Sequence, residues 1–151
     1  MSGRYPQGID YEWFAADLEG RIARFTTGGL GPIPSAVVDA DGLCEIAAIE
    51  FAKLPRRGPA RMFVNYPKSV DFSDFIRVAE SGIYTYDCDD LCSGSATRHY
   101  RLVAKPTSPL NLADLPPVAR DAASLATLRE IAFVKTIEIR PDQLGTVVSA
   151  E

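Results

Sequence analysis

The sequence predicts a single α+β domain over residues 1–151, with an antiparallel or mixed sheet of about five strands and two or three helices packed on one face. Three observations support this fold class. The 151 residues have the usual length of one domain, and 46% hydrophobic and 24% charged residues are typical of a globular protein. Segments of alternating polarity are interleaved with segments whose apolar residues recur at steps of three and four.

Residues 11–27 (YEWFAADLEGRIARFTT) predict a β-hairpin. Aromatic residues such as Trp13 alternate along the first strand, and Gly20 permits the tight turn that follows. In the second strand we expect Arg21 and Arg24 on the solvent-exposed face.

Residues 28–34 (GGLGPIP) predict a stiff connector, because the segment lacks the Gly-Lys-Ser/Thr ending of a phosphate-binding loop. From Ser35 to Leu54 the pattern is helical, with a break expected at Asp41 and Gly42. The predicted buried face of this helix consists of Leu43, Ile46, Ala47, Phe51 and Leu54.

A basic loop at 55–61 and a short extended segment at 62–67 precede a second helix at 69–82. Asp71 is expected to cap this helix and Gly82 to end it. Its predicted buried face consists of Phe72, Phe75, Ile76 and Ala79.

The last part of the chain predicts three strands and a helix. Strands at 83–89 and 99–106 are expected to pair as a hairpin. An arm at 108–128 carries a short helix that begins near Leu115–Pro116, since proline suits the first helical turn. A final strand is expected at 131–141.

Charge and hydropathy limit the classes of function. A net charge of -4 and a pI near 5.0 disfavour nucleic-acid binding and favour a basic protein partner. The opening MSGRYPQGID has no apolar core of a secretory signal, and no apolar run approaches the roughly 20 residues of a membrane span. With three cysteines, an odd number, we expect reduced thiols, a cytoplasmic location and no membrane association.

The segment YDCDDLC at 86–92, followed by His99, raises the question of a metal site or a reactive thiol. A zinc site with Cys88, Cys92 and His99 lacks a fourth ligand unless the distant Cys44 supplies it. A calcium loop lacks its glycine turn and its closing glutamate. Neighbouring carboxylates disfavour a thiolate. We therefore expect no catalytic residue, no cofactor and no metal here, and a small metal- or thiol-dependent hydrolase is the alternative.

A binding surface is the other chemistry that this stretch supports. Tyrosines beside acidic residues make effective anchors at protein interfaces. The predicted contact residues are Tyr84, Tyr86, Asp87, Asp89 and Asp90. Trp13 is expected in the core instead. A homodimer formed through a sheet edge is a further alternative.

Three stretches carry a resemblance to a group of known proteins: YEWFAADLEGRIARFTTGGLGPIP, GIYTYDCDD and YRLVAKPTSPLNLADLP. They resemble small bacterial proteins that are often encoded beside secreted polymorphic toxins and behave like immunity proteins. The likeness covers about two thirds of the chain and lies in structural motifs, so no catalytic residue is implied. It implies stoichiometric neutralisation of a cognate toxin.

Overall fold

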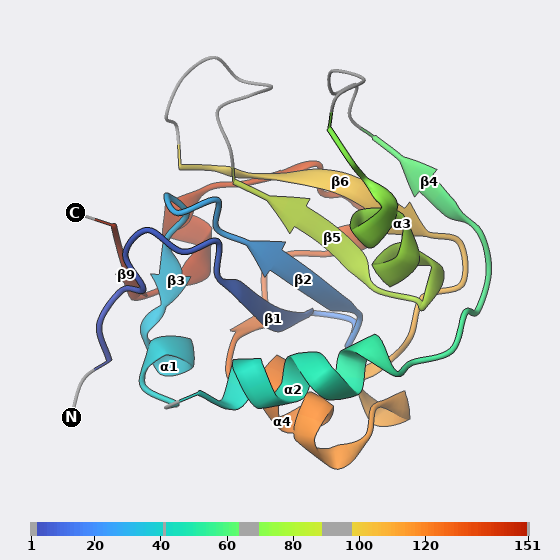
Figure 1. Cartoon of the computed structure of the whole chain (residues 1–151), viewed down its shortest axis with the longest axis horizontal. Helices are drawn as coiled ribbons and strands as arrows, with labels where there is room; N and C mark the ends of the chain where they lie inside the picture. Colours follow the sequence, from blue (N-terminus) through green and yellow to red (C-terminus); the bar gives the residue numbers. More distant parts are fainter. Residues whose placement is uncertain (1–2, 41, 64–69, 89–97, 151) are drawn as a thin grey trace.

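The centre of the molecule is a mixed β-sheet with helices over one face and the C-terminal segment over the other (Figure 1). The computed structural model describes residues 3–40, 42–63, 70–88 and 98–150. The strands of the main sheet are β1 (Glu12–Asp17), β2 (Ile22–Thr26), β4 (Ala60–Met62), β5 (Tyr84–Asp87), β6 (Tyr100–Pro106), β7 (Thr127–Leu128) and β8 (Glu138–Ile139). Their order is β4-β6-β5-β2-β1-β7, and β8 pairs with β6.

This sheet confirms the predicted α+β class, with seven strands in the described residues where about five were expected. Strands β1 and β2 form the predicted hairpin, and β5 pairs antiparallel with β6 as predicted. Strands β2 and β5 run parallel, which makes the sheet mixed. A separate two-stranded sheet joins β3 (Ile33–Pro34) to β9 (Val147–Val148).

The hairpin turn is held by the carboxylate of Asp17, which is 3% exposed. Its Oδ1 accepts hydrogen bonds from the backbone N–H groups of Glu19 and Arg21, both at 2.9 Å. Gly20 has a φ of 78°, a conformation that favours glycine. The turn therefore follows the chemistry that the sequence suggests.

Four α-helices lie in the described residues: α1 (Ser35–Val38), α2 (Leu43–Ala52), α3 (Ser73–Glu80) and α4 (Pro117–Ser124). The break predicted before Leu43 is present, with Gly42 at a φ of 85°, and proline opens α4 as expected. The predicted position of Ile46 is wrong, because its side chain is 58% exposed. The buried residues of α2 are Cys44, Ala47 and Phe51. Ile46 lies about 100° around the helix from Ala47, so its side chain points to solvent.

Helix α3 begins after Asp71, whose Oδ1 accepts a hydrogen bond from Ser73 N at 2.9 Å. Its most buried residues are Val78 and Ala79, while the aromatic residues of the predicted face are only half-buried. Gly82, at a φ of 102°, follows the helix as predicted, and an added Cβ there would approach Leu110 to 2.9 Å.

The predicted strand at 131–141 is wrong for most of its length. Residues Phe133–Lys135 form a turn of 3-10 helix, and only Glu138–Ile139 (β8) pairs with the sheet. The reason is tertiary: Phe133 N donates to Asp17 Oδ2 at 2.8 Å, and the Phe133 ring is fully buried against the sheet. Of the extended segment expected at 62–67, β4 covers the start and residues 64–67 lie outside the described ranges.

Short 3-10 turns also occur at Leu112–Asp114 and Pro141–Leu144. In the part of the chain that the structure describes, no helix is both long and apolar enough to cross a membrane.

Candidate functional site

The predicted contact tyrosines lie in the core. Tyr84 is 1% exposed and Tyr86 is fully buried, so neither ring is available to a partner. Strand β5 pairs with β2 so that Tyr86 lies beside Phe25, with the ring centroids 5.2 Å apart. Phe133 covers both tyrosines, and Tyr86 OH donates to Thr136 O at 2.6 Å. We refer to this side of the sheet, with Trp13, Phe25, Tyr84, Tyr86 and Tyr100, as the aromatic face.

The acidic part of the predicted patch is described only at Asp87. Its carboxylate is half-buried at the end of β5 and accepts a hydrogen bond from Thr26 Oγ1. Asp89 and Asp90 lie outside the described residues. The described contact of Asp87 is therefore a hydrogen bond between neighbouring strands at the end of β5.

The described thiols are buried, whereas the side chain of His99 is partly exposed. Cys44 is 1% and Cys88 2% exposed, and burial raises the pKa of the Cys44 thiol to about 11. His99 Nδ1 contacts Glu138 Oε1, and Cys92 lies outside the described ranges. The described residues hold no group of three or more His, Cys, Asp or Glu side chains placed to bind a metal ion.

A cleft lies on the opposite face of the sheet, between α2 and α3. Its volume is about 100 Å³. The lining residues are Glu12, Phe14, Arg24, Ala48, Phe51, Ala52, Asp74, Arg77 and Val78, and we call this site the Arg24 cleft. The side of the sheet that it occupies is the helical face, where α4 packs against α2 and β1.

The floor of this cleft consists of side chains that alternate along β1 and β2 and point to the same face of the sheet. In the β1–β2 hairpin, Phe14 lies opposite Arg24, so both side chains point to the helical face. Glu12, two residues before Phe14, lies on the same side. The Phe14 ring stacks on Phe51 of α2 with centroids 3.9 Å apart, which fixes the helix over the hairpin.

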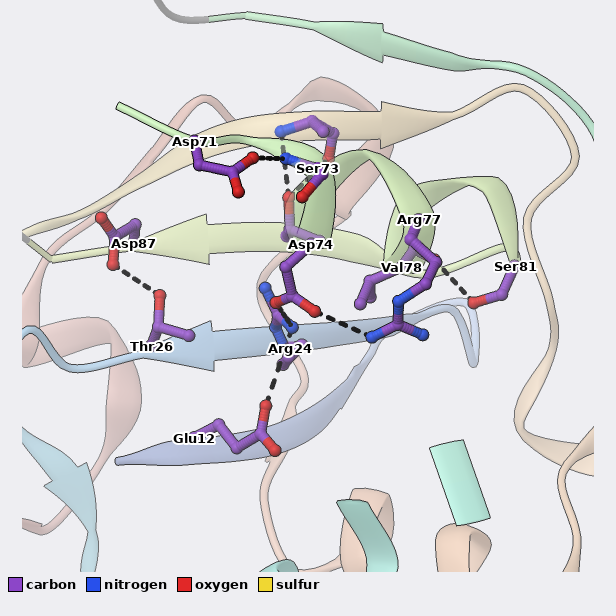
Figure 2. Close-up of polar contacts among 12 residues, drawn as sticks. Glu12, Arg24, Thr26, Asp71, Ser73, Asp74, Arg77, Val78, Ser81 and Asp87 are labelled. Atoms are coloured by element: carbon purple, nitrogen blue, oxygen red, sulfur yellow. Dashed lines mark hydrogen bonds and ion pairs between the residues drawn. The ribbon is translucent and has the colours of Figure 1, made fainter. Parts of the chain in front are cut away.

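Arg24 is the central residue of the site. The prediction of a solvent-exposed position for it is wrong, because the residue is 3% exposed. Its Nη1 lies 2.6 Å from Asp74 Oδ2 and 3.7 Å from Glu12 Oε2, and its Cζ lies 5.1 Å from the centroid of the Phe75 ring. Its Nε and Nη2 atoms are buried and have no hydrogen-bond partner among the described residues. Figure 2 shows Glu12 and Asp74 reaching Arg24 from two different elements.

The two carboxylates of the cleft respond differently to this environment. Burial raises the pKa of Glu12, and the nearby Asp74 raises it further against the opposing effect of Arg24. Burial also acts to raise the pKa of Asp74, but Arg24 and Arg77 outweigh that effect, so the pKa lies below its ordinary value. Arg77 Nη2 lies 2.8 Å from Asp74 Oδ1.

On its solvent-facing side, α2 carries two exposed isoleucines, Ile46 at 58% and Ile49 at 59%. We call this pair the α2 ridge. Ile49 lies three residues before the cleft residue Ala52, so these two side chains are neighbours on the helix surface, whereas Ile46 lies about 160° around the helix from the cleft residue Ala48. Charged residues flank the ridge, including the Glu50–Lys53 ion pair at 3.6 Å.

Sequence reasoning missed Arg24, Glu12 and Asp74 as site residues. One signal was present in the sequence. Arg24 and Ile22 are two residues apart on β2, so their side chains lie on the same face of the sheet, and a helix that covers Ile22 also covers Arg24. For Asp74 no such signal exists, since it approaches Arg24 from a helix 50 residues away.

A scan against protein-family models matched no family, and searches of curated proteins and of solved structures returned no match to this chain.

Proposed function

We propose that this chain is a non-catalytic binding protein that engages a protein partner through its helical face. The observation that carries the proposal is the presence on one helix, α2, of both a wall of the Arg24 cleft and the exposed α2 ridge. Arg24, with two buried nitrogens that have no partner among the described residues, lies in a cleft lined by α2, and the same helix carries exposed aliphatic side chains. Arginine and apolar anchors surrounded by polar groups are the usual composition of an interface centre.

The partner that we propose is a basic protein. The chain carries a net charge of -4, and complementary charge speeds the encounter between partners. Asp87, Asp89 and Asp90 would contribute to this attraction without making the central contacts. The resemblance to immunity proteins supports a specific role, the neutralisation of a cognate toxin in the bacterial cytoplasm.

The experiment is a pull-down from the source bacterium with wild-type protein and two matched double variants. Ile46→Lys with Ile49→Lys places charge on the α2 ridge. Val134→Lys with Ile137→Lys is the control, because these side chains are 49% and 56% exposed and belong to the segment that covers the aromatic face. Each pair has a spacing of three residues.

We expect the wild type and the control to retain one partner at one-to-one stoichiometry by light scattering, and the ridge variant to lose it. Circular dichroism would establish that all three proteins are folded. Equal retention of the partner by both double variants would refute the assignment to the helical face.

The alternative function is a metal- or thiol-dependent hydrolase that uses Cys88, Cys92 and His99. One contact favours keeping it: Glu138 holds Nδ1 of His99, an arrangement that orients imidazole groups in metal sites. The test is the metal content of the purified protein. Stoichiometric zinc that is lost on Cys92→Ser would support the hydrolase, and an unchanged metal content in that variant would exclude a site with Cys92 as ligand.

A further inference from the structure

We propose that the Arg24 cleft is a receptor for a single carboxylate group, which Arg24 binds in bidentate fashion through its Nε–Nη2 edge. The inference names the chemical group that this site recognises. It depends on the proposed function only where that group belongs to a partner protein.

The shape of the guanidinium group supports this assignment. The N–H bonds of Nε and Nη2 point in parallel along one edge of the planar group, with the spacing of the two oxygens of a carboxylate. Asp74 already engages the remaining nitrogen, Nη1, at 2.6 Å. The edge without a partner is thus one that can form two parallel hydrogen bonds.

Burial makes this edge costly to leave without an acceptor. Both nitrogens are buried, and the Phe75 ring lies over the guanidinium carbon at 5.1 Å. Buried polar atoms in native proteins nearly always have a hydrogen-bond partner, and charged donors lose the most without one. The outer wall consists of Asp74 and Arg77, whose side chains are 57% and 52% exposed and can move to admit a ligand.

The size and lining of the cleft limit the ligand. Its volume of about 100 Å³ leaves room only for a small group. That space fits a carboxylate with one or two further carbon atoms. Phe14, Phe51 and Val78 provide apolar walls for those carbons. Acetate, or the end of an aspartate or glutamate side chain, has this size.

The charges of the site favour a monoanion. Arg24 and Arg77 contribute two positive charges, and Glu12 and Asp74 contribute two negative charges when ionised. A phosphate dianion would be repelled by both carboxylates more strongly than an acetate ion. Protonation of Glu12, which also faces Asp10, removes one of these repulsions. Uptake of a proton by Glu12 should therefore tighten the binding of a carboxylate that is still ionised.

The direct test follows the Arg24 Nε–H signal by NMR while the protein is titrated with sodium acetate, sodium chloride or sodium phosphate at matched ionic strength. We expect acetate to produce a saturable shift at one site, with chloride and phosphate producing a smaller, non-saturating change. Acetate behaviour identical to that of chloride, or tighter binding of phosphate, would overturn the proposal.

Variants locate the site. Arg24→Lys keeps the charge but loses the planar fork, and we expect acetate binding, measured by calorimetry, to weaken about tenfold or more. The matched control is Arg56→Lys, an exposed arginine paired with Glu80 at 3.1 Å outside the cleft. Ala48→Leu, which fills the cleft and leaves Arg24 in place, should also abolish binding. This second variant decides the question if Arg24→Lys does not fold, and unchanged acetate binding in it would place the site elsewhere.

Two sources of the carboxylate remain to be distinguished. If a partner side chain supplies it, acetate should compete with partner capture and Arg24→Lys should lose the partner. If a free molecule supplies it, acetate should bind while capture stays unchanged. The acetate titration uses the chain alone and tests the carboxylate site, whereas the pull-down with the ridge variant tests partner binding. Either proposal can therefore fail while the other stands.

Discussion

The two faces of the central sheet bury side chains of different kinds. On the aromatic face, Trp13 stacks on Phe25 at 4.2 Å, and its Nε1 donates to Tyr100 OH at 3.1 Å. Tyr100 OH in turn donates to Pro32 O at 2.9 Å. On the helical face, a charged arginine occupies the middle of the sheet and two of its nitrogens have no partner among the described residues.

This difference separates a face that stabilises the fold from the face that we propose to bind a partner. The aromatic face contains large rings, and the polar atoms of Trp13, Tyr86 and Tyr100 are paired with protein groups, as a stable core requires. The helical face contains a cleft, an ion pair and a carboxylate with a raised pKa. Perturbed titratable groups in a cleft are typical of functional sites. Substitutions on the two faces should therefore have different consequences.

The largest expected effect is on the aromatic face. Trp13→Ala removes a fully buried ring and its hydrogen bond, and we expect a loss of about 3–5 kcal/mol in the free energy of unfolding. Urea denaturation followed by fluorescence of an added dye or by circular dichroism measures it. The acetate affinity of the folded fraction should not change. A loss below that of an ordinary surface substitution would contradict the role of this face.

On the helical face, Asp74→Ala removes the main partner of the buried Arg24. We expect a loss of about 1–2 kcal/mol, between the values for a fully buried and an exposed ion pair, because Asp74 itself is half exposed. Asp142→Ala is the matched control, since its pair with Arg140 at 3.1 Å lies on the surface. Arg24→Met combined with Asp74→Ala should be no less stable than Asp74→Ala alone. A clearly less stable double variant would show that Arg24 stabilises the fold without Asp74.

A smaller effect is expected from Tyr86→Phe, which removes the hydrogen bond to Thr136 O. We expect a loss of about 1 kcal/mol, measured by urea denaturation. Tyr84→Phe is the control, because the Tyr84 hydroxyl makes no hydrogen bond to any described residue and its loss should have little effect. Equal losses in both variants would assign the effect to the change in the rings and not to the hydrogen bond.

The smallest effect concerns the pH dependence of stability. Because the pKa of Glu12 is raised in the folded protein, the native state binds its proton more tightly than the unfolded chain does. Its contribution is therefore present below the ordinary pKa of 4.5 and is lost as the pH rises through the raised value. The lowered pKa of Asp74 acts in the opposite direction at lower pH.

The matching variant is Glu12→Gln. We expect its stability to vary less with pH above about 4.5 than that of the wild type, in urea denaturation measured at a series of pH values. Parallel pH profiles for the two proteins would contradict the raised pKa.

Local sequence signals predicted the elements that depend on local physics. The hairpin needed only alternation and the turn chemistry of Asp17 and Gly20, and the opening of α4 needed only a proline. The prediction failed at 131–141, where alternation suggested a strand. A carboxylate from the hairpin turn and a place for the Phe133 ring in the aromatic face determined a 3-10 turn there instead.

The prediction of the site residues also failed where the outcome depends on distant segments. The sequence placed Trp13 in the core and suggested aromatic and acidic contacts, but it could not tell which side of β5 would be covered. That outcome depends on Phe133, almost 50 residues after Tyr86 and Tyr84. Packing of two remote segments thus removed both tyrosines from the surface.

Composition and periodicity were enough to predict an acidic α+β domain with a tryptophan-bearing hairpin, because both act over short stretches of chain. The burial of Arg24 and its contacts with Glu12 and Asp74 depend instead on how distant elements pack together. Those three side chains come from β2, β1 and α3, and their meeting depends on the packing of α3 over the sheet. The distances and burial in the Arg24 cleft arise from such long-range contacts, which alternation along a single strand does not specify.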